Sequence, residues 1–427
     1  MRIRLRSLFH VALFVMRAEL VFVVAIIGFL IGLVPSLLDL PTEVAWLLAA
    51  AGLVLATVFL VRDVLGLLGR WSSWSMRRLQ PVRFPESLTV PFLPVIIETP
   101  TGRVAIDPNL DAALATAQNR IQWSVKPYRL PDELARLAPY ILRTSASGRW
   151  PFNGPDVALE TDLSLAAIES GEEIKARPGN FFSELCSNEL TGWAISSSGN
   201  SIDFKERYLF DSRNQLLSLG QSQLANGIGV STLAITSDSK LVLTLQSVSS
   251  QTSGGMWAPS GSGALEPRDG LDGHDSLLID VVIRGAEREL CEEGRIKPAW
   301  IRQSRVIGYS RWLDRGGKPE FYCVTSLSVH SSELRTGSGT HSMLSEERTW
   351  TSDVQVLDVN LTTIKGFDPG DPASHTLPLW ARAGLIPNVD ILTGSTSVPL
   401  HASLDALART VHRSPHLLAD LELKQSR

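Results

Sequence analysis

Residues 284–296 read RGAERELCEEGRI, and this stretch decides how the surrounding region folds. Glu289, Glu292 and Glu293 are three and four residues apart, so their carboxylates lie on one side of a helix. Carboxylates this close repel one another unless a cation lies among them, and such oxygen ligands suit Mg²⁺ or Mn²⁺. The stretch therefore indicates either a metal-binding helix or a charged, solvent-exposed helix end.

An apolar stripe at helical spacing leads into these glutamates. It begins near Ser276, and Gly294 is a natural stop after the last turn. The stripe consists of Ile279, Val282, Ile283, Ala286 and Leu290. A helix that packs on a sheet through this stripe holds its carboxylates beside the sheet.

The flanking segments predict that sheet. Val230–Thr236 and Leu241–Gln246 are rich in β-branched and apolar residues and enclose a polar turn, which predicts a buried hairpin. Strand candidates return at Ser304–Tyr309 and Glu320–Ser326, and an amphipathic helix is predicted over His401–His412. Strands on both sides of a single helix favour an α+β or layered α/β domain.

The N-terminus differs from the rest of the chain. Residues 20–38 and 44–61 carry no charge, and each run approaches the ~20 residues with which a helix crosses the hydrocarbon layer. The loop between them is acidic and both outer flanks are rich in arginine, which predicts that both termini are cytoplasmic. We therefore expect residues 1–80 to form a transmembrane α-helical hairpin that anchors the protein in the cell (inner) membrane with two spans.

Two other interpretations of the apolar runs are a cleaved signal peptide and a buried helical hairpin. The length of the runs and the second run directly after the first argue against both. Gly28 and Gly32 form a small-xxx-small pair, through which the hairpin would support oligomerisation.

Composition limits which partners and which cellular compartment fit the chain. The net charge of -4 and the pI of about 6.1, without a broad basic surface, argue against a nucleic-acid partner. The cysteines are odd in number and widely separated, which fits a reducing compartment. Prolines punctuate residues 81–150, the expected connector, and residues 151–420 form the expected α/β domain with an N-terminal extension.

Gly263, five residues, Asp269, and later the run Arg288-Glu289-Leu290-Cys291-Glu292-Glu293 resemble the signature of Nudix hydrolases. The family's box runs Gly, five residues, Glu, seven residues, then Arg-Glu-apolar-any-Glu-Glu-any-Gly-apolar. The resemblance covers residues 225–360, with the box at 263–296. It implies a Nudix-like α/β/α sandwich with a mixed sheet, fused here to the membrane hairpin.

The box departs from the family pattern in three places. Eighteen residues separate Asp269 from Arg288 where the family has seven, so the loop carries an insertion of 11 residues that includes His274. Arg295 stands where the family usually has its glycine, and the upstream acid is Asp instead of Glu. An insertion that moves Asp269 away from the glutamates would favour ligand binding over catalysis.

The resemblance implies a role for each box residue. Carboxylates would bind Mg²⁺ or Mn²⁺, which would neutralise pyrophosphate oxygens and lower the pKa of the attacking water. The expected metal ligands are Glu289, Glu292 and Glu293, and these three with Arg288 form the expected catalytic set. The expected substrate contacts are Gly261, Gly263 and Asp269.

Several roles stay open. A general base is needed, and it is either a box glutamate or a later acid such as Glu346 or Glu347, for which a solvated charge pair is the alternative. His274 is expected at the surface and Cys291 in the helix core. The aromatic side chains of Trp257, Tyr309 and Trp312 either stack on a nucleobase or fill the core.

Two functions of different class follow. The first is a membrane-anchored, cytoplasm-facing Nudix-type hydrolase that cleaves the pyrophosphate of a nucleoside diphosphate derivative by metal-assisted water attack. The second is a membrane-bound nucleotide sensor or effector whose Nudix-like domain binds its ligand with little or no turnover. The intact glutamates favour the first, and the insertion favours the second.

Overall fold

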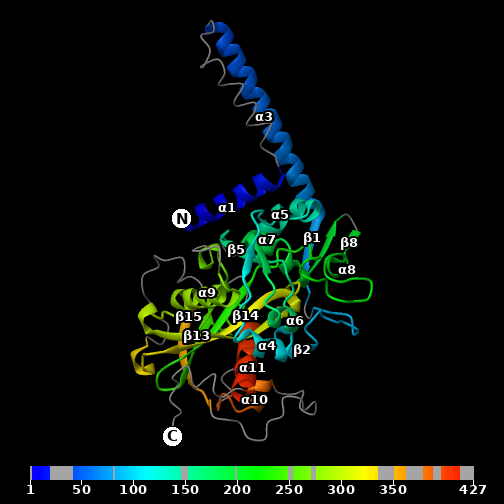
Figure 1. Cartoon of the computed structure of the whole chain (residues 1–427). Helices are drawn as coiled ribbons and strands as arrows, with labels where there is room; N and C mark the ends of the chain where they lie inside the picture. The colour runs from blue at the N-terminus through cyan, green and yellow to red at the C-terminus, as the bar shows by residue number, and fades with distance from the viewer. Residues whose placement is uncertain are drawn as a thin grey trace.

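The computed structural model describes residues 2–19, 42–79, 82–145, 152–197, 200–248, 253–270, 276–334, 351–361, 378–387 and 396–413. Within these ranges one sheet of nine strands forms the centre of the molecule (Figure 1). Its strands are β2 (Val95–Thr99), β3 (Gly102–Ile106), β9 (Gly229–Ile235), β10 (Lys240–Gln246), β11 (Trp257–Ala258), β12 (Gly261–Ala264), β13 (Ile301–Trp312), β14 (Lys318–Leu327) and β15 (Thr351–Asp358).

The central sheet is mixed. Its order is β11-β10-β9-β14-β13-β3-β2, with β12 paired to β9 and β15 paired to β10. The β9 and β14 strands run parallel, and the other neighbours run antiparallel. The expected hairpin is confirmed as β9 and β10, whose bounds lie within a residue of those predicted.

Two helices cover opposite faces of this sheet. These are α9 (Leu278–Glu293) and α11 (Val398–Arg413). Successive side chains of a strand point to opposite faces, so Phe321 packs in the core cluster of α9 while its neighbour Tyr322 packs with α11. The α9 side of this core includes Val282 and Ala286 of the expected apolar stripe, together with Val281, which was not part of that stripe.

Smaller elements surround the sheet. Two sheets of three strands have the orders β4-β6-β5 and β1-β7-β8 among the described residues. Their strands are β1 (Trp74–Arg78), β4 (Ile121–Trp123), β5 (Pro155–Leu159), β6 (Ile174–Asn180), β7 (Trp193–Ser197) and β8 (Asn200–Ile202). The smaller helices are α4 (Pro108–Leu114), α5 (Asp132–Ser145), α6 (Leu165–Glu169), α7 (Phe181–Leu185), α8 (Phe204–Tyr208) and α10 (Leu379–Arg382). The 3₁₀ helices are η1 (Asn188–Gly192), η2 (Pro267–Asp269), η3 (Pro298–Trp300), η4 (Leu313–Arg315) and η5 (Ser331–Glu333).

The segment expected as a connector is part of the central fold. Its strands β2 and β3 extend the sheet, because β3 pairs with the end of β13 at Arg311 and Trp312. Asp111 of α4 accepts hydrogen bonds from the backbone N–H of Tyr309 (2.9 Å) and from Arg409 of α11 (2.9 Å). The β2 and β3 strands of the expected connector therefore belong to the same sheet as the box strand β12, and α4 packs against it.

The N-terminal helices correct the expected fold class. They are α1 (Arg2–Glu19) and α3 (Thr42–Ser73), and Figure 1 shows α3 projecting from the body while α1 lies beside α5. In the part of the chain that the structure describes, no helix joins sufficient length to sufficient apolar character to cross a bilayer. The transmembrane component of the predicted fold, and the two-span membrane localisation with it, are therefore wrong.

Of the two apolar runs that suggested the hairpin, one lies within the described residues and the other does not. Residues 44–61 lie within α3, which continues past this run through Arg62, Asp63 and Arg70 instead of ending at its polar boundary. The other run, 20–38, lies outside the described residues together with Gly28 and Gly32.

Candidate functional site

A cavity of about 440 Å³ lies at the C-terminal end of α9. Its size is typical of small-molecule pockets, which span roughly 300–1,000 Å³. Glu289, Glu292 and Glu293 all line it, together with Gly263 of β12. The three glutamates predicted from their helical spacing therefore share one concave surface.

Arg288 holds this end of α9 against the loop that precedes it. Its guanidinium donates to both carboxylate oxygens of Asp269 (2.9 Å each) and to the backbone oxygen of Ala264 (2.7 Å). It also donates to Glu289 (2.7 Å) and Glu292 (3.2 Å). Planar guanidinium groups suit such bidentate contacts, so Arg288 links the upstream acid of the box to two of its glutamates.

The insertion leaves Asp269 beside the box helix. Asp269 closes η2, where its carboxylate also accepts from the backbone N–H of Glu266 (2.8 Å), and its backbone oxygen accepts from Arg284 (2.6 Å). Its side chain is 4% exposed and does not line the cavity. Asp269 thus positions Arg288, and the substrate contact expected of Asp269 stays a prediction.

Gly261 and Gly263 let β12 approach α9 closely. A Cβ atom at Gly261 would lie 2.4 Å from the backbone nitrogen of Leu290, and one at Gly263 would lie 2.2 Å from the carboxyl carbon of Glu289. Glycine is used where a backbone must approach another group this closely. The glycines predicted as substrate contacts therefore make room for the helix, and of the two, Gly263 lines the cavity.

Burial changes the acidity of two box glutamates. It raises the pKa of Glu289 above its usual range, against the lowering effect of Arg288. It also raises the pKa of Glu293, where repulsion by Glu289 adds to the effect. Glu293 accepts hydrogen bonds from the backbone N–H of Ser262 (3.1 Å) and from Gln246 (3.4 Å), which hold it over the edge of β12.

The end of α9 explains the displaced glycine of the box. Gly294 has φ -76° and closes the helix with an N–H bond to the Leu290 oxygen, while Arg295 has φ 57°. Arg295 thus adopts the left-handed conformation that glycine adopts readily, and it stands at the position where the family usually has glycine. Gly294 is needed for a different reason, because a Cβ there would lie 2.6 Å from the backbone oxygen of Ser260.

The expected three-carboxylate metal site is not found. Among the described residues, no group of three His, Cys, Asp or Glu side chains is arranged to hold a metal ion. The Nη1 atom of Arg288 lies between Glu289 and Glu292 and supplies the positive charge that these carboxylates require. The prediction that the three glutamates form a metal-holding group is therefore wrong for this conformation.

Further charged residues that sequence reasoning missed also line the cavity. Glu184 accepts from Arg315 (2.6 Å) and Lys318 (3.1 Å), and all three line the cavity. The other acids of the lining that were missed are Asp156, Glu266 and Glu320. Glu266 lies three residues before Asp269, and that proximity was a usable signal; Asp156 and Glu184 come from the N-terminal extension and had none.

The remaining candidate residues are placed as follows. Tyr309 is buried in the core at 1% exposure, whereas Trp312 lines the cavity at 8% exposure. Trp257 is half-buried against the α11 core. Cys291 is half-buried, and burial raises the pKa of its thiol. His274, Glu346 and Glu347 lie outside the described residues.

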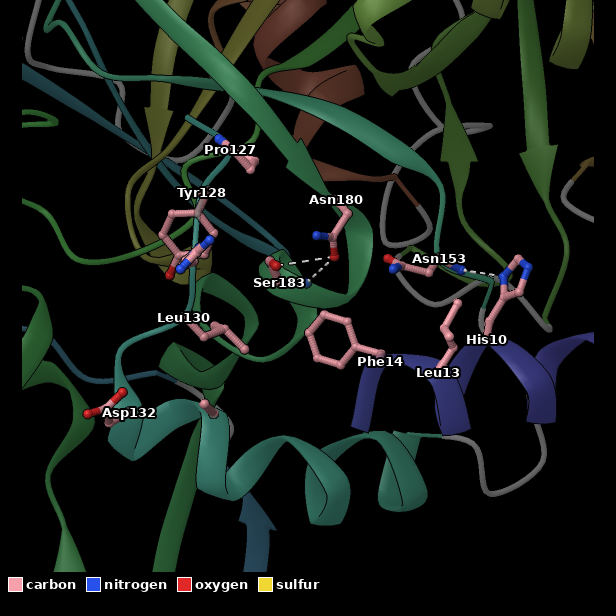
Figure 2. A pocket seen from close by; sticks show the side chains of 12 residues that line it. His10, Leu13, Phe14, Pro127, Tyr128, Leu130, Asp132, Asn153, Asn180 and Ser183 are labelled. Atoms are coloured by element: carbon pink, nitrogen blue, oxygen red, sulfur yellow. Dashed lines mark hydrogen bonds between the residues drawn. The ribbon is translucent and has the colours of Figure 1, made fainter. Parts of the chain in front are cut away.

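A larger cavity of about 750 Å³ lies beside α1 (Figure 2). Its polar groups are largely used within the protein: the backbone N–H of Asn153 donates to His10 (3.1 Å), and Ser183 donates to the side chain of Asn180 (3.0 Å). The hydroxyl of Tyr128 donates to the backbone oxygen of Gln223 (2.8 Å). None of the box residues lines it, so the smaller cavity is the candidate site.

Comparison with known proteins adds little. No protein-family model and no curated protein matches the chain. Among solved structures, the crystal structure of DR0079 from Deinococcus radiodurans matches with 14% sequence identity, covering 35% of this chain and 82% of that chain at a TM-score of 0.21. A similarity of this size carries no argument about fold or function.

Proposed function

We propose that this chain is a Nudix-type pyrophosphohydrolase that cleaves the pyrophosphate of a nucleoside diphosphate derivative. The observation that carries the proposal is the convergence of Glu289, Glu292 and Glu293 on one cavity, with Asp269 still attached to the box helix despite the insertion. Carboxylates gathered in a concave site with raised pKa values are typical of functional sites.

The carboxylates of the cavity fit a metal that enters with the substrate. Mg²⁺ is commonly held by one or two carboxylates plus substrate phosphates, so a preformed group of three is not required. Glu292 and Glu293 fit this role better than Glu289, whose carboxyl group is packed against Gly263. When bound, Mg²⁺ would neutralise the pyrophosphate oxygens and lower the pKa of the attacking water.

The protein's own residues prepare the site in three ways. Arg288 keeps Glu289 and Glu292 oriented, and the Ser262 N–H orients Glu293. The cavity walls exclude bulk water from the buried carboxylate of Glu289, which strengthens electrostatic interactions there.

The test is cleavage of a panel of nucleoside diphosphate derivatives by the full chain, with Mg²⁺ or Mn²⁺, followed by chromatography of the nucleotide products. Glu292→Gln and Glu293→Gln should each lower kcat by at least about 100-fold, the scale of a lost charge-stabilising group. Glu287→Gln, on the same helix but outside the cavity, should retain activity. Full activity in both cavity variants, or cleavage that does not depend on a divalent metal, would refute the proposal.

One observation favours a second function, nucleotide binding with little or no turnover. Arg288 already neutralises Glu289 and Glu292, which leaves the cavity less anionic than a metal site requires. Metal-independent binding of a nucleotide to the full chain, with no product formed from any member of the panel, would select this function over hydrolysis.

A further inference from the structure

The larger cavity beside α1, the α1 cavity, has an apolar side and a polar side (Figure 2). Its apolar side chains come from α1, from the segment before α5 and from α5 itself: Leu13, Phe14, Pro127, Leu130 and Ala135. Phe14 is fixed by an edge-to-face contact with Phe182, whose ring centre lies 5.5 Å from its own. In Figure 2 the side-chain amides of Asn153 and Asn180 lie across the cavity from Leu13 and Phe14.

The polar side presents hydrogen-bond donors, because the protein itself uses the amide oxygens. The side-chain oxygen of Asn153 accepts from the backbone N–H of Phe182 (2.9 Å), and that of Asn180 accepts from the backbone N–H of Ser183 (3.0 Å). A backbone N–H can only donate, so these bonds fix which end of each amide is the oxygen. The NH₂ groups of Asn153 and Asn180 have no partner among the described residues, and they are available to a ligand.

Two charged side chains lie at the mouth of this cavity. Arg129 and Asp132 both line it and are both exposed. Asp132 lies in the first turn of α5, where the positive end of the helix dipole offsets its charge. Arg129 has no hydrogen bond or ion pair within the part of the chain that the structure describes. The charge of Arg129 is therefore not balanced, which favours a negative charge on a ligand.

These features select the chemistry of a ligand. The two amide NH₂ groups require acceptor atoms and Arg129 favours a negative charge, and a carboxylate supplies both. A phosphate group, with its charge of nearly -2, fits less well, because Arg129 is the only lysine or arginine of the described lining. The apolar side chains across from the amides suit a hydrocarbon chain. The cavity therefore fits an aliphatic carboxylate.

The α1 cavity has a wall in common with the box cavity, the smaller cavity at the end of α9. Asn153 lines the α1 cavity, whereas its neighbours Phe152 and Gly154 line the box cavity. In the same way Ser183 lines the α1 cavity and Glu184 lines the box cavity. A ligand in the α1 cavity therefore contacts segments that shape the box cavity without entering it.

We propose that the α1 cavity is a second ligand site, which binds an aliphatic carboxylate such as a medium-chain fatty acid. The carboxylate accepts from the side-chain amides of Asn153 and Asn180, and the chain lies along Leu13 and Phe14 of α1. His10 of α1 already accepts from the backbone N–H of Asn153 (3.1 Å), so the ligand adds contacts where α1 meets the rest of the protein. The inference does not rest on the proposed hydrolase, because none of the box residues lines this cavity.

The test is calorimetric binding of hexanoate, octanoate and 1-octanol to the full chain. Octanoate should bind about tenfold more tightly than 1-octanol, because a charged acceptor strengthens the hydrogen bonds from the amides. Octanoate should also bind about 15-fold more tightly than hexanoate, since each buried CH₂ contributes about fourfold in affinity.

Matched variants separate recognition from folding. Asn153→Asp and Asn180→Asp keep an oxygen that accepts from the backbone and replace the NH₂ donor with a negatively charged oxygen. Each should weaken octanoate binding by at least about tenfold and leave 1-octanol binding unchanged. Asn109→Asp makes the same change at an exposed position outside the cavity and should alter neither affinity. Unchanged urea midpoints show that the variants fold.

The expected result is octanoate binding that persists in Glu292→Gln, a variant of the box cavity, and is lost in Asn180→Asp. Equal affinity for octanoate and 1-octanol, no binding of either, or octanoate affinity that survives in both asparagine variants would overturn the inference. Loss of octanoate binding in Glu292→Gln would also overturn it, because that loss would place the ligand in the box cavity.

Discussion

Replacing Arg288 with alanine should be strongly destabilising, because this side chain joins buried acids from two parts of the chain. The Arg288 side chain is 12% exposed and those of Asp269 and Glu289 are 4% and 11% exposed. The substitution removes both bonds to Asp269 and the bond to the Ala264 oxygen, and it leaves two buried carboxylates without their cation.

The magnitude follows from that burial. Removing one partner of a buried ion pair costs about 3–5 kcal/mol, because the remaining charge stays desolvated. Arg268 offers a matched control: it also contacts Glu266 and Glu292, but its side chain is 59% exposed, so Arg268→Ala should cost only about 0–1 kcal/mol.

Urea denaturation of the full chain, followed by tryptophan fluorescence, measures both costs. In a double-mutant cycle, Asp269→Ala added to Arg288→Ala should cost much less than Asp269→Ala alone, because the double variant leaves no unpaired Asp269 carboxylate. The reasoning fails if Arg288→Ala costs no more than Arg268→Ala, or if the losses of stability in Asp269→Ala and Arg288→Ala simply add.

Three other substitutions or conditions test the site and its support. Gly263→Ala should cost about 1–3 kcal/mol and displace Glu289, whereas Gly154→Ala, with open space around it, should be nearly neutral; thermal denaturation compares the two. Arg295→Gly should raise stability by roughly 1 kcal/mol, since it relieves a left-handed backbone at φ 57°, and an unchanged urea midpoint would contradict this. Burial lowers the pKa of His401 to about 4 from an ordinary value of 6.5, so the folded state resists protonation that the unfolded chain accepts. The contribution of neutral His401 to the free energy of unfolding is therefore complete above pH 6.5 and is lost as pH falls toward 4, by up to about 3 kcal/mol. The variant His401→Gln should flatten this part of a curve of stability against pH.

The local pattern of apolar and polar residues was sufficient to predict the box helix α9 and the β9–β10 hairpin. The spacing of Val282, Ala286 and Leu290 sets which side of α9 faces the sheet, and the same spacing places the three glutamates together. The β9–β10 hairpin follows from two apolar runs and a short turn. These features depend on residues close in the chain, so the sequence predicts them directly.

The apolar content of the N-terminal region was not sufficient to predict its structure. The run 44–61 predicted a membrane span that ends at this run, but α3 extends through Arg62 and Asp63 to Ser73. A helix can continue through charged residues because its backbone bonds are local, so the end of an apolar run does not set the end of a helix. The membrane hairpin was therefore inferred from an apolar composition that did not determine where α3 ends.

Contacts between distant segments decided the rest of the site. The position of Asp269 depends on the path of a loop whose length alone does not determine where it returns, and Asp156 reaches the cavity only because β5 bonds to segments adjoining β9 and β12. Repulsion among the three glutamates shows from the sequence that a positive charge must lie near them. The tertiary structure supplies that charge from Arg288, because Asp269 and the Ala264 oxygen hold its guanidinium between Glu289 and Glu292.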